Sequence, residues 1–251
     1  MFKNIFKKDK KKETPTAPPE NDLINAAFFN AIKEAKKKDP LAGLKMGADE
    51  INARLFDAIK NDKGVNVDIA LRILSALAGF SCQMSIREAV IKTGKASEKE
   101  AFTIVNTKNG DTYYMGGLLN APLIDSKMSV WSLVGGAIQQ VQGELPDLKE
   151  IASYGASTVG DKNFGKPRVD EKHLLGEPSQ NYVQALWPKL SPIIDRFCDN
   201  PTQRPILLGI ALYKLIIQAK DVIDPKTAGI LCMDTAVAMS KIDPKRLNID
   251  V

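Results

Sequence analysis

The chain has 251 residues, of which 44% are hydrophobic and 26% charged, a composition that excludes global disorder and a length that allows a buried core without disulfides or metals. Six lysines and one aspartate within residues 1–12 account for the whole formal net charge of +5, so residues 13–251 carry no net charge. A neutral body argues against a nucleic-acid-binding domain, which usually carries a basic face, and we expect no specific nucleic-acid partner.

Residues 1–20 are predicted to form a disordered tail, because a lysine run followed by prolines buries too little apolar surface to offset the entropy of ordering. One interpretation, favoured for a block of like charge, is a solubilising arm. The other is a weak contact with an anionic membrane, to which each lysine contributes about 1 kcal/mol. The predicted membrane contacts are Phe2, Lys3, Phe6, Lys7, Lys8, Lys10, Lys11 and Lys12.

Residues 21–251 are predicted to form one mainly α-helical domain of about seven to nine helices. Apolar residues recur every three or four positions along most of this region, which is the period of an amphipathic helix. Pro40 and Gly64 follow the first two helices and are typical stop signals. The first four predicted helices cover about residues 21–39, 41–61, 67–80 and 85–92.

One β-hairpin is predicted over about residues 101–117. Strand-forming residues occupy 102–105 and 112–115, and Asn109-Gly110 between them is a preferred centre of a type I′ turn. A lone hairpin is marginal in water, so it must pack against helices or a further strand. The two-residue turn would pair Lys108 with Asp111, Asn106 with Tyr113 and Val105 with Tyr114.

Helical patterning resumes at Ser129 and ends near Gly143, which suits a C-terminal cap. The segment 153–180 is rich in glycine and proline, and so long an irregular segment is uncommon in a compact domain. Either it contains short helices or it is a functional or mobile loop. The last third is predicted to be helical over about residues 180–198, 205–217 and 225–242, with a kink or restart near Pro188 and Pro192.

A binding surface is predicted where the hairpin meets the following helix. Tyrosine and tryptophan combine apolar area with a polar tip, and an asparagine would add polar specificity. Core packing is the competing interpretation of the aromatic residues. The residues of this predicted surface are Tyr113, Tyr114, Asn120 and Trp131.

No cofactor and no metal site are expected, because there is one histidine and the three cysteines form no C-x-x-C pair. Cysteine usage and the lack of a secretory pattern favour a cytoplasmic location, with the inner membrane surface as an alternative. His173 lies among charged residues and is interpreted as a solvated loop residue, with acid–base catalysis as the alternative. Cys198 is the most plausible reactive thiol, although a structural role is favoured.

The segment 155–162 nearly matches a phosphate-binding P-loop. Asp161, however, follows the second glycine where a lysine is required, and no clear strand precedes the segment. A flexible loop is therefore favoured over a phosphate cradle.

These features favour a non-enzymatic interaction or regulatory module with a protein partner or a homo-oligomeric state. The first alternative is an enzyme whose site is assembled from scattered polar residues under the 153–180 segment. The second is a peripheral membrane protein attached through residues 1–12. No motif fixes a reaction, so whether the chain is an enzyme stays open.

Overall fold

The computed structural model describes residues 20–250, with side chains from residue 26 onward. The described chain is mainly helical and carries one two-stranded antiparallel hairpin, which confirms the predicted fold class. The predicted tail, and with it the predicted membrane contacts, lies outside the described residues, apart from Glu20 at the start of the first helix. The α-helices are α1 Glu20–Lys38, α2 Ala42–Ile59, α3 Val67–Ile86, α4 Glu98–Ala101, α5 Gly117–Asn120, α6 Val130–Gln140, α7 Leu148–Ser157, α8 Ser179–Asp195, α9 Arg204–Gln218 and α10 Pro225–Met239.

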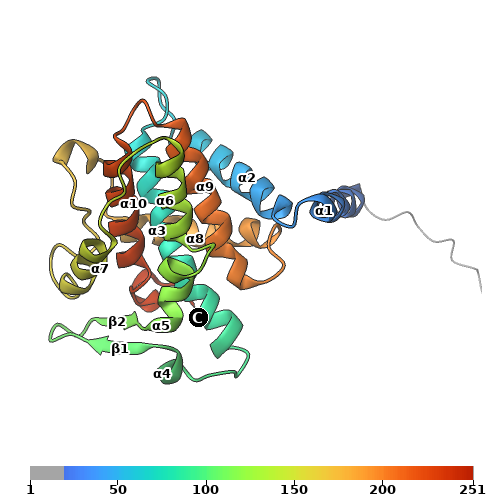
Figure 1. Ribbon diagram of the computed structural model, residues 1–251. Coiled ribbons are helices and arrows are strands. Elements are labelled where there is room, and N and C mark those ends of the chain that lie inside the picture. The colour runs from blue at the N-terminus through green and yellow to red at the C-terminus, as the bar shows by residue number, and fades with distance from the viewer. Residues whose placement is uncertain (1–19, 251) are drawn as a thin grey trace, which may run out of the picture.

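Helix α3 is the centre of the core. Every residue from Ala70 to Ile86 is buried, and α8, α9 and α10 pack around it. Figure 1 shows α3, α6, α9 and α10 stacked side by side, with the hairpin beyond one end of the stack. Among the described residues, the stretch Val67–Ile91 is the one helix long and apolar enough to cross a membrane, and 94% of its apolar window is buried inside the fold. That burial is typical of a core helix.

The helix boundaries follow local capping chemistry. The side chains of Asn66, Ser129, Asp147 and Asp224 accept hydrogen bonds from backbone N–H groups in the first turns of α3, α6, α7 and α10. The predicted helix over 85–92 is instead a continuation of α3, because a π-helical turn, Arg87–Ile91, extends it without a break. Helix α8 continues through both of its prolines.

The end of α6 differs from its prediction by one residue. Gln142, and not Gly143, adopts the left-handed conformation, with φ of +60°. The N–H of Gly143 then donates to the carbonyl of Ile138, and that of Gln142 to Gln139, which is the Schellman arrangement. Gly143 is still required, because a Cβ there would collide with Pro225 at the start of α10.

The hairpin, β1 Thr103–Asn106 and β2 Thr112–Met115, is present, but its predicted register is wrong by one residue. Val105 pairs with Tyr113, and Asn106 with Thr112. The loop has three residues, because Gly110 takes φ of +84° and the N–H of Thr107 donates to the carbonyl of Asp111. A type I turn followed by a left-handed glycine produces this loop, and Asn-Gly fits it as well as it fits a two-residue turn.

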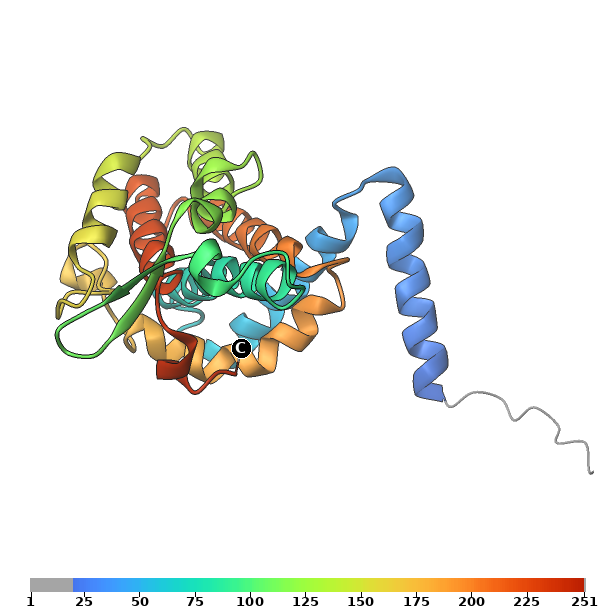
Figure 2. The same ribbon diagram turned by 90° about the horizontal axis from the view of Figure 1, so that it is seen from below.

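The hairpin packs on the end of the helical stack, as a marginal two-stranded unit must. The N–H of Tyr114 donates to the carbonyl of Lys241, and Tyr113 forms a β-bridge with Ile242 just after α10. Helix α1 lies at the opposite side of the molecule, where Figure 2 shows it projecting from the body beyond α2. The ring of Phe28 in α1 contacts the ring of Phe197 after α8, edge to face.

Candidate functional site

The irregular segment between α7 and α8 crosses the core helices and covers a cavity. We call residues 158–178 the strap. The predicted irregular segment begins earlier, at residue 153, but residues 153–157 complete helix α7. Within the strap, one short 3-10 turn, Glu171–His173, is present.

The strap is held to α3 by two polar side chains one helical turn apart. The guanidinium of Arg72 donates from Nη1 to the carbonyl of Leu175 (2.6 Å) and from Nη2 to the carbonyl of Glu177 (2.7 Å). Asp68, four residues earlier, lies 3.0 Å from Nδ1 of His173. Residues at i and i+4 share a helix face, so both anchors act on the same side of α3.

A second anchor holds the strap to α10. Asp234 has a fully buried carboxylate, which accepts hydrogen bonds from Nε, Nη2 and the backbone N–H of Arg168, all between 2.9 and 3.0 Å. The hydrogen bond to Asp234 raises the pKa of Arg168 above its usual value. Tyr154 of α7 lies under the guanidinium, and its hydroxyl donates to the carbonyl of Lys166. The middle of the strap is therefore fixed to two helices.

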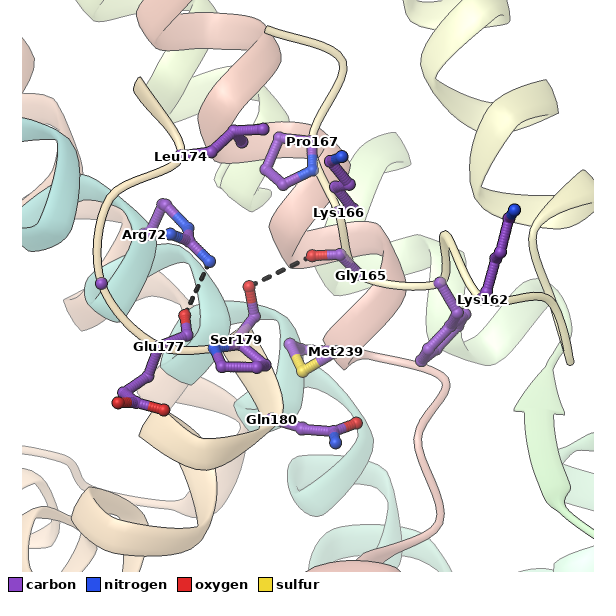
Figure 3. A pocket seen from close by; sticks show the side chains of 13 residues that line it. Arg72, Lys162, Gly165, Lys166, Pro167, Leu174, Glu177, Ser179, Gln180 and Met239 are labelled. Carbon is purple, nitrogen blue, oxygen red and sulfur yellow. Dashed lines mark hydrogen bonds between the residues drawn. The ribbon is translucent and has the colours of Figure 1, made fainter. Parts of the chain in front are cut away.

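The cavity lies between the two anchors and has a volume of about 290 Å³. In Figure 3, Arg72 of α3 and Met239 of α10 lie on its inner side, and the strap and the start of α8 surround it. The hydroxyl of Ser179 donates to the carbonyl of Gly165 across the cavity wall, at 3.2 Å. The lining residues are Arg72, Lys162, Phe164, Gly165, Lys166, Pro167, Leu174, Gly176, Glu177, Pro178, Ser179, Gln180 and Met239.

Gly176 is the residue of the strap whose identity the structure explains most directly. Its φ is +89°, and a Cβ there would collide with the hydroxyl of Tyr182. That hydroxyl accepts the N–H of Glu177 at 2.8 Å, beside the carbonyl that binds Arg72. Glycine thus permits the close turn that brings both carbonyl acceptors to α3.

The chemistry of the cavity is set by its cations. Arg72 is 4% exposed, and burial lowers its pKa, yet an arginine in a protein stays protonated. Lys162 and Lys166 are exposed at the rim. The carboxylate of Glu177 accepts a hydrogen bond from Asn181, and Figure 3 shows it directed away from Arg72. The arrangement can bind a small molecule that has acceptor oxygens.

The predicted binding surface is divided between different environments. Tyr113 is buried against Phe164 and hydrogen-bonded to Arg246, whereas Tyr114 is buried against Phe102 and Arg87. Adjacent strand residues point to opposite faces, which explains the separation. Asn120 is exposed at the end of α5, and Trp131 is partly buried in α6. A binding surface shared by these four residues stays a prediction. Tyr113 lies next to the cavity, because its ring contacts Phe164, which is one of the lining residues.

His173 is not the solvated residue that its charged neighbours suggest. Its side chain is 16% exposed because the strap folds it against Asp68, which is distant in sequence. The near match to a P-loop has no cradle geometry either, since residues 155–157 end helix α7 and Gly160 forms a turn against Thr107. Burial raises the pKa of the Cys198 thiol to about 12, which agrees with the favoured structural role.

Arg72 and Asp234 were not predicted as functional residues from the sequence, although the sequence contains a signal for them. Each is the one charged residue in a long run of uncharged residues, 69–86 around Arg72 and 227–240 around Asp234, and such a charge is almost never buried without a partner. Among the described residues, no group of three or more histidine, cysteine, aspartate or glutamate side chains could hold a metal ion. Comparison of the chain with protein-family models, curated proteins and solved structures finds no match.

Proposed function

We propose that this protein is a ligand-responsive regulatory module, in which a small molecule occupies the cavity and a protein partner recognises the strap above it. The observation that carries the proposal is the double anchorage of the strap: Arg72 and Arg168 fix it to α3 and α10 on either side of a cavity. Cavities that bind ligands are usually preformed and lined by apolar groups with a few placed polar ones.

Occupancy of this cavity would alter the strap more than the core. The strap has little regular structure, and most of its backbone hydrogen bonds are local turns, so its local stability is lower than that of α3. Leu175, in the turn bound by Arg72, is 50% exposed and provides an apolar contact for a partner. A ligand that contacts both the strap and the helices would stabilise the anchored position of the strap. The size of this effect equals the difference in the ligand's binding free energy between the anchored and the detached strap.

The experiment is native mass spectrometry of the full chain purified gently from its own host, followed by hydrogen exchange. We expect a small molecule that is released on collisional activation, and faster exchange of the amides of residues 160–178 after its removal. The exchange of α3 should stay unchanged and provides the internal control. A protein that carries no small molecule, and whose strap exchanges equally before and after dialysis, would contradict the proposal.

A second candidate function is an enzyme with its site under the same segment, and one observation favours it. The carboxylate of Asp68 orients the ring of His173, an arrangement that acid–base catalysis uses, and Leu174 next to it lines the cavity. Under this alternative, His173→Ala abolishes a turnover found by substrate screening. Full turnover in that variant would remove the histidine from any mechanism.

A further inference from the structure

We propose that the cavity binds the anionic group, phosphate or carboxylate, of a small molecule that also has an apolar body. This inference rests on the proposed function, since it assumes that a small molecule occupies the cavity. It names the chemistry of that molecule from the charges that line the site.

The first observation is a difference between the arginines that hold this fold together. Arg87 pairs with Glu98 at 2.5 Å, Arg204 pairs with both Glu88 and Asp195 at 2.6 Å, and Arg168 pairs with Asp234 at 3.0 Å. Arg72 is as buried as Arg87 and Arg204, but within residues 26–250 its hydrogen bonds go to two backbone carbonyls and no carboxylate forms an ion pair with it. Asp68, one helical turn earlier, acts on Arg72 through space, but its carboxylate contacts His173, so no ion pair among these residues offsets the cost of burying the guanidinium.

The second observation is the spare hydrogen-bonding capacity of Arg72. A guanidinium has five N–H donors, and the two carbonyls take one donor each. The Nε atom is buried without a hydrogen-bond partner in the described structure. The carbonyl bonds also fix the plane of the guanidinium, so an anion would meet an oriented group.

The third observation is the charge around the rim. Lys162 and Lys166 form no ion pair with the described carboxylates, and both line the cavity. Glu177, the acidic residue in the lining, is bonded to Asn181. The lining thus has an excess of positive charge, although the body as a whole is neutral.

The rest of the lining requires an apolar part in the ligand. Phe164, Leu174, Met239, Pro167 and Pro178 line the cavity with apolar side chains. A volume of about 290 Å³ lies at the low end of the range of ligand pockets, which suits a small molecule and not a nucleotide. One anionic group near Arg72 and a compact apolar body against Phe164 and Met239 would use both kinds of surface.

The test is isothermal titration calorimetry on the full chain with phenyl phosphate, benzoate, inorganic phosphate and the neutral amide benzamide. We expect phenyl phosphate or benzoate to bind, benzamide not to bind measurably, and the preferred anion to identify the group as phosphate or carboxylate. Inorganic phosphate should bind more weakly than phenyl phosphate because it lacks the apolar body. Raising the salt concentration should weaken the binding of the anions.

Substitutions at the rim test the position of the anion without disturbing the anchors. The double variant Lys162→Gln, Lys166→Gln should weaken binding of the preferred anion by roughly tenfold, as expected when two exposed charges are removed. Lys172→Gln is the matched control, because Lys172 is an exposed lysine of the strap that does not line the cavity and lies near Asp170. It should leave the affinity unchanged, and thermal unfolding should show all variants folded.

The outcomes separate this inference from the function on which it rests. Binding of benzamide as strong as that of benzoate, or unchanged anion affinity in the double variant, would overturn the anionic assignment. A neutral or cationic compound released from the host-purified protein would also overturn it, while leaving the ligand-responsive function intact. The absence of both a released compound and any probe binding would refute the two proposals together.

Discussion

The two ends of α3 each carry a buried arginine, and the two are satisfied in different ways. Arg87 at the C-terminal end pairs with Glu98 and stacks on Tyr114, while neighbouring Arg204 pairs with Glu88 and Asp195. Arg72 near the N-terminal end bonds to strap carbonyls and faces a cavity. At the first end each buried arginine has a carboxylate partner, although Nη2 of Arg87 forms no hydrogen bond within residues 26–250. At the second end no carboxylate of the described residues forms an ion pair with Arg72, and the proposed anion site rests on this difference.

Removal of Arg204 should produce the largest loss of stability. Arg204→Met keeps the apolar stem near Trp187 but leaves Glu88 and Asp195 without their partner. We expect the free energy of unfolding to fall by about 2 kcal/mol, because the hydrogen bonds of a buried guanidinium to two charged groups are lost while both carboxylates keep access to water. Urea denaturation measures the change. Arg54→Met, which breaks an exposed pair with Glu50, is the control and should cost about 0.5 kcal/mol or less.

Lys241 is a second buried cation whose hydrogen bond goes to a carbonyl. Unlike an arginine, it can lose its proton at accessible pH, so the cost of burying its charge can be measured as a function of pH. Its ammonium donates to the carbonyl of Val237, and burial lowers its pKa to about 8. Lys241→Met should therefore raise the free energy of unfolding at pH 7. We expect a gain of about 2 kcal/mol, which is less than the full cost that the lowered pKa implies, because the variant also loses the hydrogen bond to Val237. Thermal and urea unfolding of both proteins measure this difference.

The pH dependence of that difference follows from proton linkage. Below pH 8 the lysine is charged in both the folded and the unfolded state, so the cost of burial is fully present. Between pH 8 and 10.5 the folded protein releases the proton and the unfolded chain keeps it, so the stability of the unsubstituted protein rises with pH. The gap to Lys241→Met should close over this window. A gap that stays constant up to pH 10.5 would show that the ammonium is solvated.

Arg72→Met should cost less than Arg204→Met, because it removes a buried charge that forms no ion pair with the described carboxylates, along with two hydrogen bonds to carbonyls. Its carbonyl partners belong to exposed residues and can bond to water instead. We expect a loss of about 1 kcal/mol in the free energy of unfolding. Amides of residues 173–178 should exchange faster in the variant. A loss equal to that of Arg204→Met would mean that the carbonyls satisfy Arg72 as completely as carboxylates satisfy Arg204.

The smallest effect is expected at the other contact of the strap with α3. His173→Ala removes a pair with Asp68 that is partly open to solvent, and should lower the free energy of unfolding by less than about 1 kcal/mol. Hydrogen exchange should rise around residues 170–174 and stay unchanged near Arg168. Uniformly faster exchange along the whole strap would instead identify His173 as its main anchor.

Much of the fold could be read from local patterns. Asn66 and Asp224 begin helices because their side chains accept backbone N–H groups a few residues along the chain. Asn109-Gly110 located the turn of the hairpin, yet two loop lengths fit the same dipeptide, and the longer one is present. Ser85 to Lys92 read as a separate helix because a π turn shifts the apolar face without ending the helix.

The candidate site was predicted only in outline. The glycine and proline content of residues 153–180 marked a segment of interest, but Arg72 and Asp234 lie in helices whose pattern indicates core. The aromatic residues Tyr113 and Tyr114 attracted a site prediction because they adjoin in sequence. The pleat of the strand separates them, and tertiary contact joins Tyr113 to Phe164 of the strap.

The sequence by itself determined the helical class, the N-caps of α3 and α10, the existence of the hairpin and the neutrality of the body, because these depend on composition and on contacts within a few residues. The tertiary structure decided which buried cation meets a carboxylate and which meets a carbonyl. That choice depends on groups about 100 residues apart, such as Arg72 and Glu177, or Arg204 and Glu88. Their distance is set by the packing of whole helices, so the cavity and its excess of positive charge emerge only when α3, α10 and the strap come together.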